Sequence, residues 1–225
     1  MLAAGDEANP VAQSARESLC ATYWYPLYAY IRRSGRDAEE ARDLTQEFFA
    51  NFLSRNRVSY ADPARGRFRT FLLTAMKYFL ANEWKKENRL KRGGGQHLLP
   101  LDADAGEQRF AAEPADSVTP EVIYERRWAV TLLELVLRRL GEECAAAGRG
   151  EQFEQLKANL WGDNQDMTQA EIAACLGMTE SAYKVSAHRM RARYRELLRE
   201  EIAHTVASPA DIDDELRHLA AVVSA

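Results

Sequence analysis

The segment from Met167 to Leu198 constrains the fold more than any other part of the chain. Ile172, Ala173 and Leu176 share one helical face, and the small Ala173 lets a second helix cross close by. Gly177 then supplies a residue that can adopt the left-handed conformation of a tight turn. After Thr179, a potential helix cap, five inward residues recur three or four positions apart: Tyr183, Ala187, Met190, Tyr194 and Leu197. The pattern predicts a helix-turn-helix.

The outer side of the second helix is almost entirely cationic. From Glu180 to Arg199 there are six Lys or Arg residues and two Glu, a balance of +4 in a chain whose total is −4. The outward positions are Ser181, Lys184, Val185, His188 and Arg189. In a recognition helix such positions meet base edges and phosphates. The pattern favours a DNA-reading helix, and a solvated amphipathic hairpin is the alternative.

Composition favours an all-α protein of two small helical domains. The 225 residues are 46% hydrophobic, helix formers dominate, and no run alternates long enough between apolar and polar residues to predict a strand. No apolar stretch is long enough to span a membrane, and the first residues do not resemble a signal peptide. We therefore expect a cytoplasmic protein without a membrane partner.

Residues that could carry chemistry are scattered. Cys20, Cys144 and Cys175 lack the paired spacing of zinc sites or of a disulfide framework, and the four histidines lie in separate segments without a recognisable nucleophile. We expect no metal, no cofactor and no catalytic residues, so the chain is not predicted to be an enzyme.

Residues 93–118 predict a flexible acidic linker. Glycine, proline, alanine and acidic residues replace helical periodicity here, and six acidic residues stand against one Arg between Gln96 and Glu121. The chain is thereby divided into a flexible N-terminus (1–15), a helical domain (16–92), the linker, a helix-turn-helix domain (119–206) and a C-terminal extension (207–225).

Three helices are expected before the linker. The first spans Ser18 to Arg33, with Pro26 as a kink or boundary. Asp37 opens the second in a capping box with Glu40. The second helix carries an outer ridge of three carboxylates and an amide: Glu40, Asp43, Gln46 and Glu47. By residue type alone, such a ridge is most often a solvated face.

The third helix, which begins at Phe68, lies in a strongly basic stretch. From Arg65 to Arg92 there are nine Lys or Arg residues against Glu83 and Glu87, a balance of +7. Tyr78 and Trp84 stand among these cations, a mixture typical of surfaces that hold single-stranded DNA. Taken alone, the two aromatics would more often belong to the core.

The C-terminal extension carries a short apolar stripe of Ile212, Leu216, Leu219 and Val223 after a cap at Ser208 and Pro209. An isolated helix of this length is marginal in water, so we expect it to dock within the same chain, against the C-terminal domain or the face between domains. A docked tail would act as a switch. An intermolecular partner and a disordered end are the alternatives.

Three segments together resemble, in this order, motif regions of the extracytoplasmic-function sigma factors of bacterial RNA polymerase. They are DLTQEFFANFL at 43–53, FRTFLLTAMKYFLANEWKKENR at 68–89 and the segment at 167–198. The long linker and the C-terminal extension indicate a subgroup of that family. The resemblance implies a sigma factor that binds core RNA polymerase, through the clamp helices of its large subunit and its flap region, and directs transcription initiation at promoter DNA.

The resemblance also assigns roles to residues. It implies core-polymerase binding by the ridge of Glu40, Asp43, Gln46 and Glu47. It implies minus-ten DNA binding by Lys77, Tyr78, Asn82, Trp84, Lys85, Lys86, Arg89, Lys91 and Arg92. For the minus-thirty-five element the residues are Glu180, Ser181, Lys184, Val185, His188, Arg189 and Arg191. An anti-sigma factor or a kinase is a further candidate partner.

Two other functions fit parts of the same sequence. A stand-alone helix-turn-helix repressor or activator needs dimer symmetry to span two half-sites. A helical adaptor would use its basic faces to bind acidic proteins. The carboxylate ridge upstream of an aromatic and basic helix favours the sigma factor, because a repressor needs neither feature.

Overall fold

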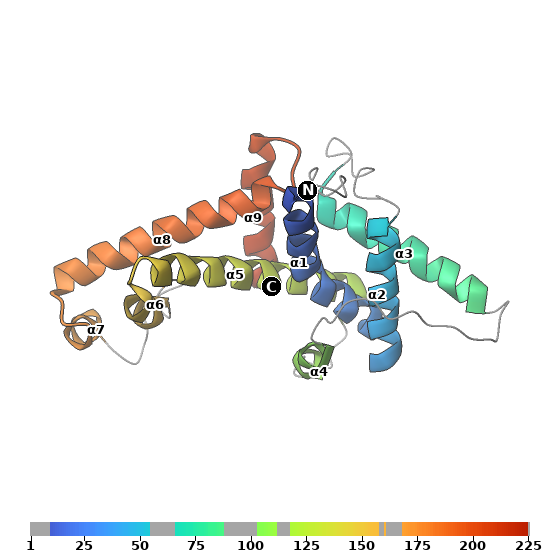
Figure 1. Cartoon of the computed structure of the whole chain (residues 1–225), viewed down its shortest axis with the longest axis horizontal. Coiled ribbons are helices and arrows are strands. Elements are labelled where there is room, and N and C mark those ends of the chain that lie inside the picture. The colour runs from blue at the N-terminus through green and yellow to red at the C-terminus, as the bar shows by residue number, and fades with distance from the viewer. Residues whose placement is uncertain are drawn as a thin grey trace. The chain divides into compact units, whose positions relative to one another are not determined.

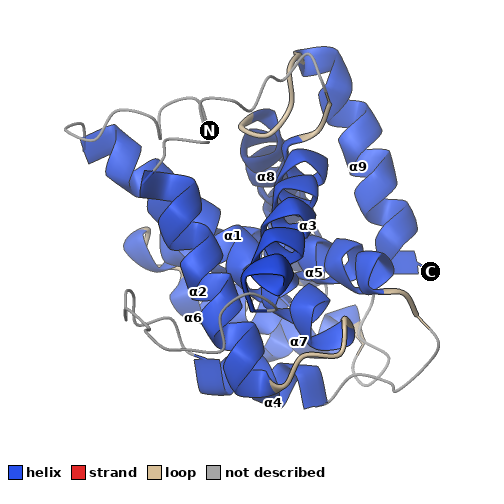
Figure 2. Cartoon of the chain, turned by 90° about the vertical axis from the view of Figure 1, so that its right-hand side faces the viewer, coloured by secondary structure: helices blue, strands red, loops and turns tan. Residues whose placement is uncertain are grey.

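The computed structural model describes residues 10–54, 66–87, 103–111, 118–157, 160 and 168–224. Every regular element within these ranges is a helix, which confirms the expected all-α class (Figure 2). In chain order they are α1 (Pro10–Arg33), α2 (Ala38–Ser54), α3 (Phe68–Glu87), α4 (Ala103–Ala111), α5 (Pro120–Ala146), α6 (Gly150–Leu156), α7 (Gln169–Cys175), α8 (Glu180–Ala203) and α9 (Pro209–Ser224) (Figure 1).

The chain forms two compact units. Unit 1 comprises residues 1–131 and 203–225, and unit 2 comprises residues 132–202. The division falls inside α5 and places the C-terminal extension with the N-terminal helices, so these units differ from the domain boundaries expected from the sequence. The composition of residues 93–118 predicted a division of the chain there, whereas the packing of α5 and α9 decides where the units divide.

Helix α1 is the centre of unit 1. Leu19 and all residues from 22 to 31 are buried. A helix that is apolar on all sides is covered on all sides. Helix α1 begins at Pro10, inside the segment expected to be a flexible N-terminus, and it continues through Pro26, so Pro26 is not a helix boundary.

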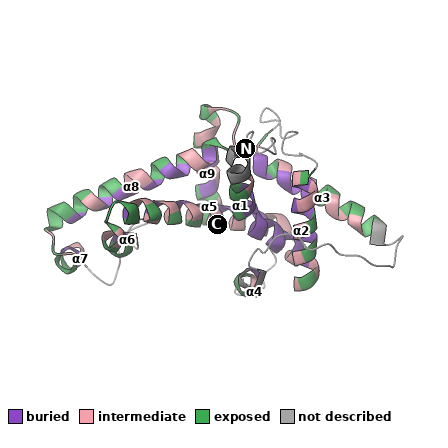
Figure 3. Cartoon of the chain, viewed as in Figure 1, coloured by how far each residue is buried: buried purple, intermediate pink, exposed green. Residues whose placement is uncertain are grey.

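Aromatic rings join α2 to α3. Phe48 contacts Phe52 within α2 and Phe79 of α3, with ring centroids 5.4 and 5.7 Å apart. Near the start of α3, Phe68 packs edge-on against Tyr23 of α1 at 5.5 Å. This packing leaves the other side of α3 to solvent, most clearly toward the C-terminal end of that helix (Figure 3).

Helix α4 lies where the sequence predicted a structureless linker, and that expectation is wrong for residues 103–111. Glu107 accepts hydrogen bonds from Arg32 Nε at 2.9 Å and Arg32 Nη2 at 2.7 Å, and it also binds the Tyr28 hydroxyl. Gly106 sits against Trp24, where an added Cβ would approach the indole to 3.0 Å. These contacts with α1 are long-range, so the glycine-rich and acidic composition of the segment could not reveal them.

Unit 2 contains the second part of α5 together with α6, α7 and α8. The five inward positions predicted for α8 are all buried: Tyr183, Ala187, Met190, Tyr194 and Leu197. The Tyr194 hydroxyl donates to the Leu133 carbonyl at 3.1 Å. Two guanidiniums join α8 to α5: Arg193 binds Glu143 through two hydrogen bonds, and Arg139 pairs with Glu200 and Glu201.

The C-terminal extension forms α9, so the alternative of a disordered end is wrong. At its start, the Asp211 carboxylate accepts hydrogen bonds from the Ser208 backbone N–H and hydroxyl, and so ties the first turn to the residue before the helix. Leu219 is buried as predicted, whereas Val223 is exposed and Glu215, which was not expected to point inward, is buried. Docking within the same chain is confirmed, and the partners lie on α3 and on the first half of α5.

Candidate nucleic-acid interface

The outer face of α3 combines exposed aromatics with polar and basic side chains. Tyr78 is 70% exposed and Trp84 is 59% exposed, so the reading of these rings as core residues is wrong. Asn82 and Lys85 are exposed too, and Tyr78, Asn82 and Lys85 follow each other at helical spacing. Large exposed rings beside cations can stack on unpaired bases while the cations meet phosphates.

Lys77 is exposed but paired. Its Nζ lies 2.7 Å from Glu121 Oε1 of α5, and the pair raises the pKa of Lys77 and lowers the pKa of Glu121. Lys86 belongs to α3, but its side chain lies outside the described residues. Arg89, Lys91 and Arg92 also lie outside the described residues.

The ridge of α2 faces outward as expected. Asp37 caps the helix by accepting the Glu40 backbone N–H at 2.8 Å. Asp43 and Glu47 are exposed, and Gln46 is half-buried beside them. Two arginines partly neutralise the ridge, since Arg36 pairs with Glu40 and Arg42 lies 3.6 Å from Asp43. The four predicted residues therefore share one accessible surface on which acidic groups predominate.

Helices α7 and α8 are joined by a short turn with caps on both sides. Thr168 and Glu171 form a capping box at the start of α7. Gly177 has φ of +62°, as the turn requires, and Thr179 accepts the Ala182 backbone N–H at 3.2 Å to cap α8. Ile172 and Ala173 are buried between these caps as predicted, whereas Leu176, the third residue expected on the inner face, is half-buried at the C-cap of α7.

The outer residues of α8 are accessible. Ser181, His188 and Arg189 are exposed, and Val185 is 46% exposed. Glu180 pairs with Lys184, both of them exposed, at 2.6 Å within the helix. Arg191 is half-buried. The first turns of α8 thus present hydroxyl, apolar and basic groups in one surface, which suits contacts with both bases and phosphates.

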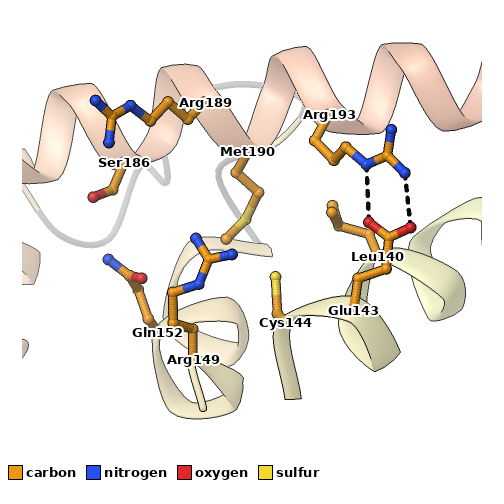
Figure 4. Close-up of a pocket in the computed structure, with 9 residues that line it drawn as sticks. All are labelled: Leu140, Glu143, Cys144, Arg149, Gln152, Ser186, Arg189, Met190 and Arg193. Atoms are coloured by element: carbon orange, nitrogen blue, oxygen red, sulfur yellow. Dashed lines mark hydrogen bonds and ion pairs between the residues drawn. The ribbon is translucent and has the colours of Figure 1, made fainter. Parts of the chain in front are cut away.

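A pocket of about 280 Å³ lies beside this surface, entirely within unit 2 (Figure 4). Leu140, Cys144 and Met190 form its apolar part, and burial raises the pKa of the Cys144 thiol. Arg149 and Gln152 flank it opposite Ser186 and Arg189 of α8, and the Arg193–Glu143 pair closes the far end: together these are the nine residues that line it. Sequence reasoning missed Arg149 and Gln152, because the residues before α8 lack a DNA-binding pattern of their own.

The described part of the chain contains no group of three or more His, Cys, Asp or Glu residues placed to hold a metal ion. Within the same residues, no helix is both long and apolar enough to cross a membrane.

Comparison with known families identifies one segment. Residues 22–90 match the family model of Sigma-70 region 2, and this segment spans the second half of α1, all of α2 and all of α3. The match includes the two resembling motifs at 43–53 and 68–89, and so supports the sigma-70 kinship that they implied. No curated protein and no solved structure matches the chain.

Proposed function

We propose that this protein is a sigma factor of the extracytoplasmic-function type, which binds core RNA polymerase and directs it to promoters. The observation that carries the proposal is the joint presence, in the segment that matches Sigma-70 region 2, of an acidic ridge on α2 and an aromatic, basic face on α3. A sigma-70 region 2 supports polymerase binding and promoter melting, and each task needs one of these two surfaces.

The ridge of Glu40, Asp43, Gln46 and Glu47 is assigned to the clamp helices of the large polymerase subunit. Exposed carboxylates at helical spacing fit a basic helix, since complementary charges give both specificity and fast association. The flap region is the second contact on the polymerase, and it belongs with unit 2.

Minus-ten DNA is assigned to α3. Trp84 and Tyr78 offer stacking surfaces for unpaired bases, and the exposed Lys85 directly follows Trp84 on the same helix. Lys77 and Asn82 extend the same surface. Lys86, Arg89, Lys91 and Arg92 continue it in the sequence, beyond the described side chains.

The minus-thirty-five element is assigned to α8 as a recognition helix preceded by α7. Lys184 and His188 are placed for base edges, Val185 for a thymine methyl, and Arg189 and Arg191 for phosphates. We assign the protein to a subgroup of the family with a long linker and a C-terminal extension, and an anti-sigma factor or a kinase is a further candidate partner. The proposed protein acts in the cytoplasm and is not an enzyme.

Charge reversal of the ridge tests the proposal. Asp43→Arg with Glu47→Arg should abolish co-purification with core polymerase, because like charges would face each other across the interface. The matched control reverses two exposed carboxylates of α9, Asp213→Arg with Asp214→Arg, and should bind polymerase normally. A ridge variant that keeps its helical circular dichroism and binds polymerase with wild-type affinity would contradict the assignment.

A further inference from the structure

The first turns of α5 contact α3 within unit 1, and earlier residues of α5 meet later residues of α3. The Tyr124 hydroxyl donates to the Arg69 carbonyl at 2.9 Å, and Arg69 Nη1 donates to both carboxylate oxygens of Glu125 at 2.6 Å. One turn earlier on α5, Glu121 reaches Lys77, about two turns later on α3. The first turns of α5 therefore have a fixed register on the helix that is proposed to hold the melted strand.

Helix α9 contacts both α3 and α5. Glu215, only 1% exposed, accepts from Arg69 Nε at 2.7 Å and from Arg67 Nε at 2.7 Å. His218 Nε2 lies 3.0 Å from Glu125, and the Arg69 guanidinium also rests 4.8 Å from the centre of the Trp128 ring. One turn of α9 thus contacts α3 and α5 together.

The Lys77–Glu121 and Arg69–Glu215 ion pairs of α3 differ in how easily another anion can replace the carboxylate. Lys77 and Glu121 are both nearly half exposed, so solvent screens their attraction, and a DNA phosphate can replace the carboxylate. Arg69 and Glu215 are buried, and each has a second partner, since Arg69 also binds Glu125 and Glu215 also binds Arg67. Separating the buried pair would leave each of these charges with one partner in place of two. Glu125 of α5 binds Arg69 and also contacts His218 of α9, so the contacts that hold α5 in register on α3 share their residues with the contacts of α9.

We propose that α9 is a clasp, a helix that keeps Glu121 paired with Lys77. The pair masks one end of the outer face of α3, which is proposed to bind the melted DNA strand. The occupant that Glu121 excludes is a phosphate of single-stranded DNA, the anion that Lys77 would otherwise bind. Release of α9 loosens the first turns of α5 and lets a phosphate take the place of the carboxylate. The clasp rests on the proposed function, because it regulates the minus-ten surface assigned there.

Binding of a fluorescent single-stranded DNA to the full chain, followed by anisotropy, tests the clasp. The probe is a thymine-rich oligonucleotide of about 15 nucleotides, long enough for one binding site. Glu121→Gln removes the masking charge, and Glu215→Gln weakens the grip of α9 without changing side-chain size. The matched control is Glu142→Gln, which neutralises an exposed carboxylate of α5 that lies 4.0 Å from Arg138 in unit 2.

Both Glu121→Gln and Glu215→Gln should tighten binding by about three- to tenfold at low salt. The control should bind as the wild type does. Each gain should vanish when Lys77→Ala is added, since the unmasked cation is then absent. In Glu215→Gln, amide hydrogen exchange should speed up at residues 209–224 and at the first turns of α5, while circular dichroism stays helical.

Three results would overturn the clasp. Wild-type affinity in both variants, with Trp84→Ala still weakening binding, would reject masking and leave the sigma-factor proposal intact. A gain in Glu121→Gln alone would show that masking does not depend on α9. No DNA binding by the wild-type chain, with or without core polymerase, would remove the clasp together with the proposed function.

Discussion

Helices α3 and α8 both present basic residues to solvent, but their cations are paired differently. Lys184 of α8 pairs with Glu180 one turn earlier in the same helix. On α3, Lys77 and Arg69 pair with Glu121, Glu125 and Glu215 from helices far away in the sequence. The surface at the first turns of α8 is therefore set by its own sequence, although Arg193 further along the helix pairs with Glu143 of α5. The surface of α3, by contrast, depends on what α5 and α9 place against it.

The largest contrast concerns stability. Arg69→Ala should destabilise unit 1 by about 3 kcal/mol, because it removes the buried guanidinium that joins Glu215 to Glu125 and leaves Arg67 as the remaining partner of Glu215. Lys184→Ala removes only an exposed pair and should change stability by about 0.5 kcal/mol or less. Urea denaturation followed by circular dichroism measures both. Equal effects would erase the distinction between the two helices.

Substitution of an exposed aromatic residue of α3 should affect DNA binding but not folding stability. Trp84→Ala should weaken single-stranded DNA binding by about 1–3 kcal/mol, since a stacking surface is lost. Its melting temperature should stay near that of the wild type, because Trp84 contributes little to the core. Val223→Ala, another exposed apolar truncation, serves as the control and should leave DNA binding unchanged. A stability loss as large as the binding loss would argue for a structural role of the indole.

Residues of α8 should divide into base readers and phosphate binders. Lys184→Ala or His188→Ala should relax discrimination at one base pair of the upstream element by about 1–3 kcal/mol. Arg191→Ala should weaken all duplex sequences alike and lower the salt slope of binding by about one. Competition among duplexes that differ at single positions distinguishes these outcomes. Uniform weakening by all three substitutions would mean that α8 does not read sequence.

The smallest predicted effect is a pH dependence of α4. Hydrogen bonds from Arg32, and one from Tyr28, hold the pKa of Glu107 below its ordinary value. The stabilisation that the charged Glu107 gives to the contact between α4 and α1 is therefore fully present above the ordinary pKa of a glutamate, about 4.3. It is lost as the pH falls through the lowered pKa of Glu107. The melting-temperature difference between wild type and Glu107→Gln should be largest near neutral pH and disappear in acid. A difference that is constant with pH would exclude this carboxylate as its source.

Local patterns predicted the parts of the molecule that local physics decides. The buried stripe of α8, the cap at Asp37 and the turn at Gly177 all follow from spacing and residue type, and the structure has them in place. The exposure of Tyr78 and Trp84 was proposed from their basic surroundings, although burial is the commoner fate of such rings.

Long-range contacts could not be predicted in the same way. Glu107 and Glu215 look like ordinary surface acids in the sequence, because their partners Arg32 and Arg69 lie more than seventy positions away. Those contacts turn part of a supposed linker into α4, and they attach α9 to α3 and α5. Pairing between distant charges depends on the assembled core, and a single sequence carries no periodic signal for it.

Promoter opening by the reconstituted holoenzyme tests the central claim most directly. Core RNA polymerase with the wild-type chain should make thymines reactive to permanganate at discrete sites on genomic DNA fragments, and neither component should do so alone. Trp84→Ala with Lys85→Ala should still assemble with polymerase but lose this reactivity. Sequence-specific duplex binding by the chain alone, with no opening when core polymerase is added, would contradict the account and identify a stand-alone DNA-binding regulator.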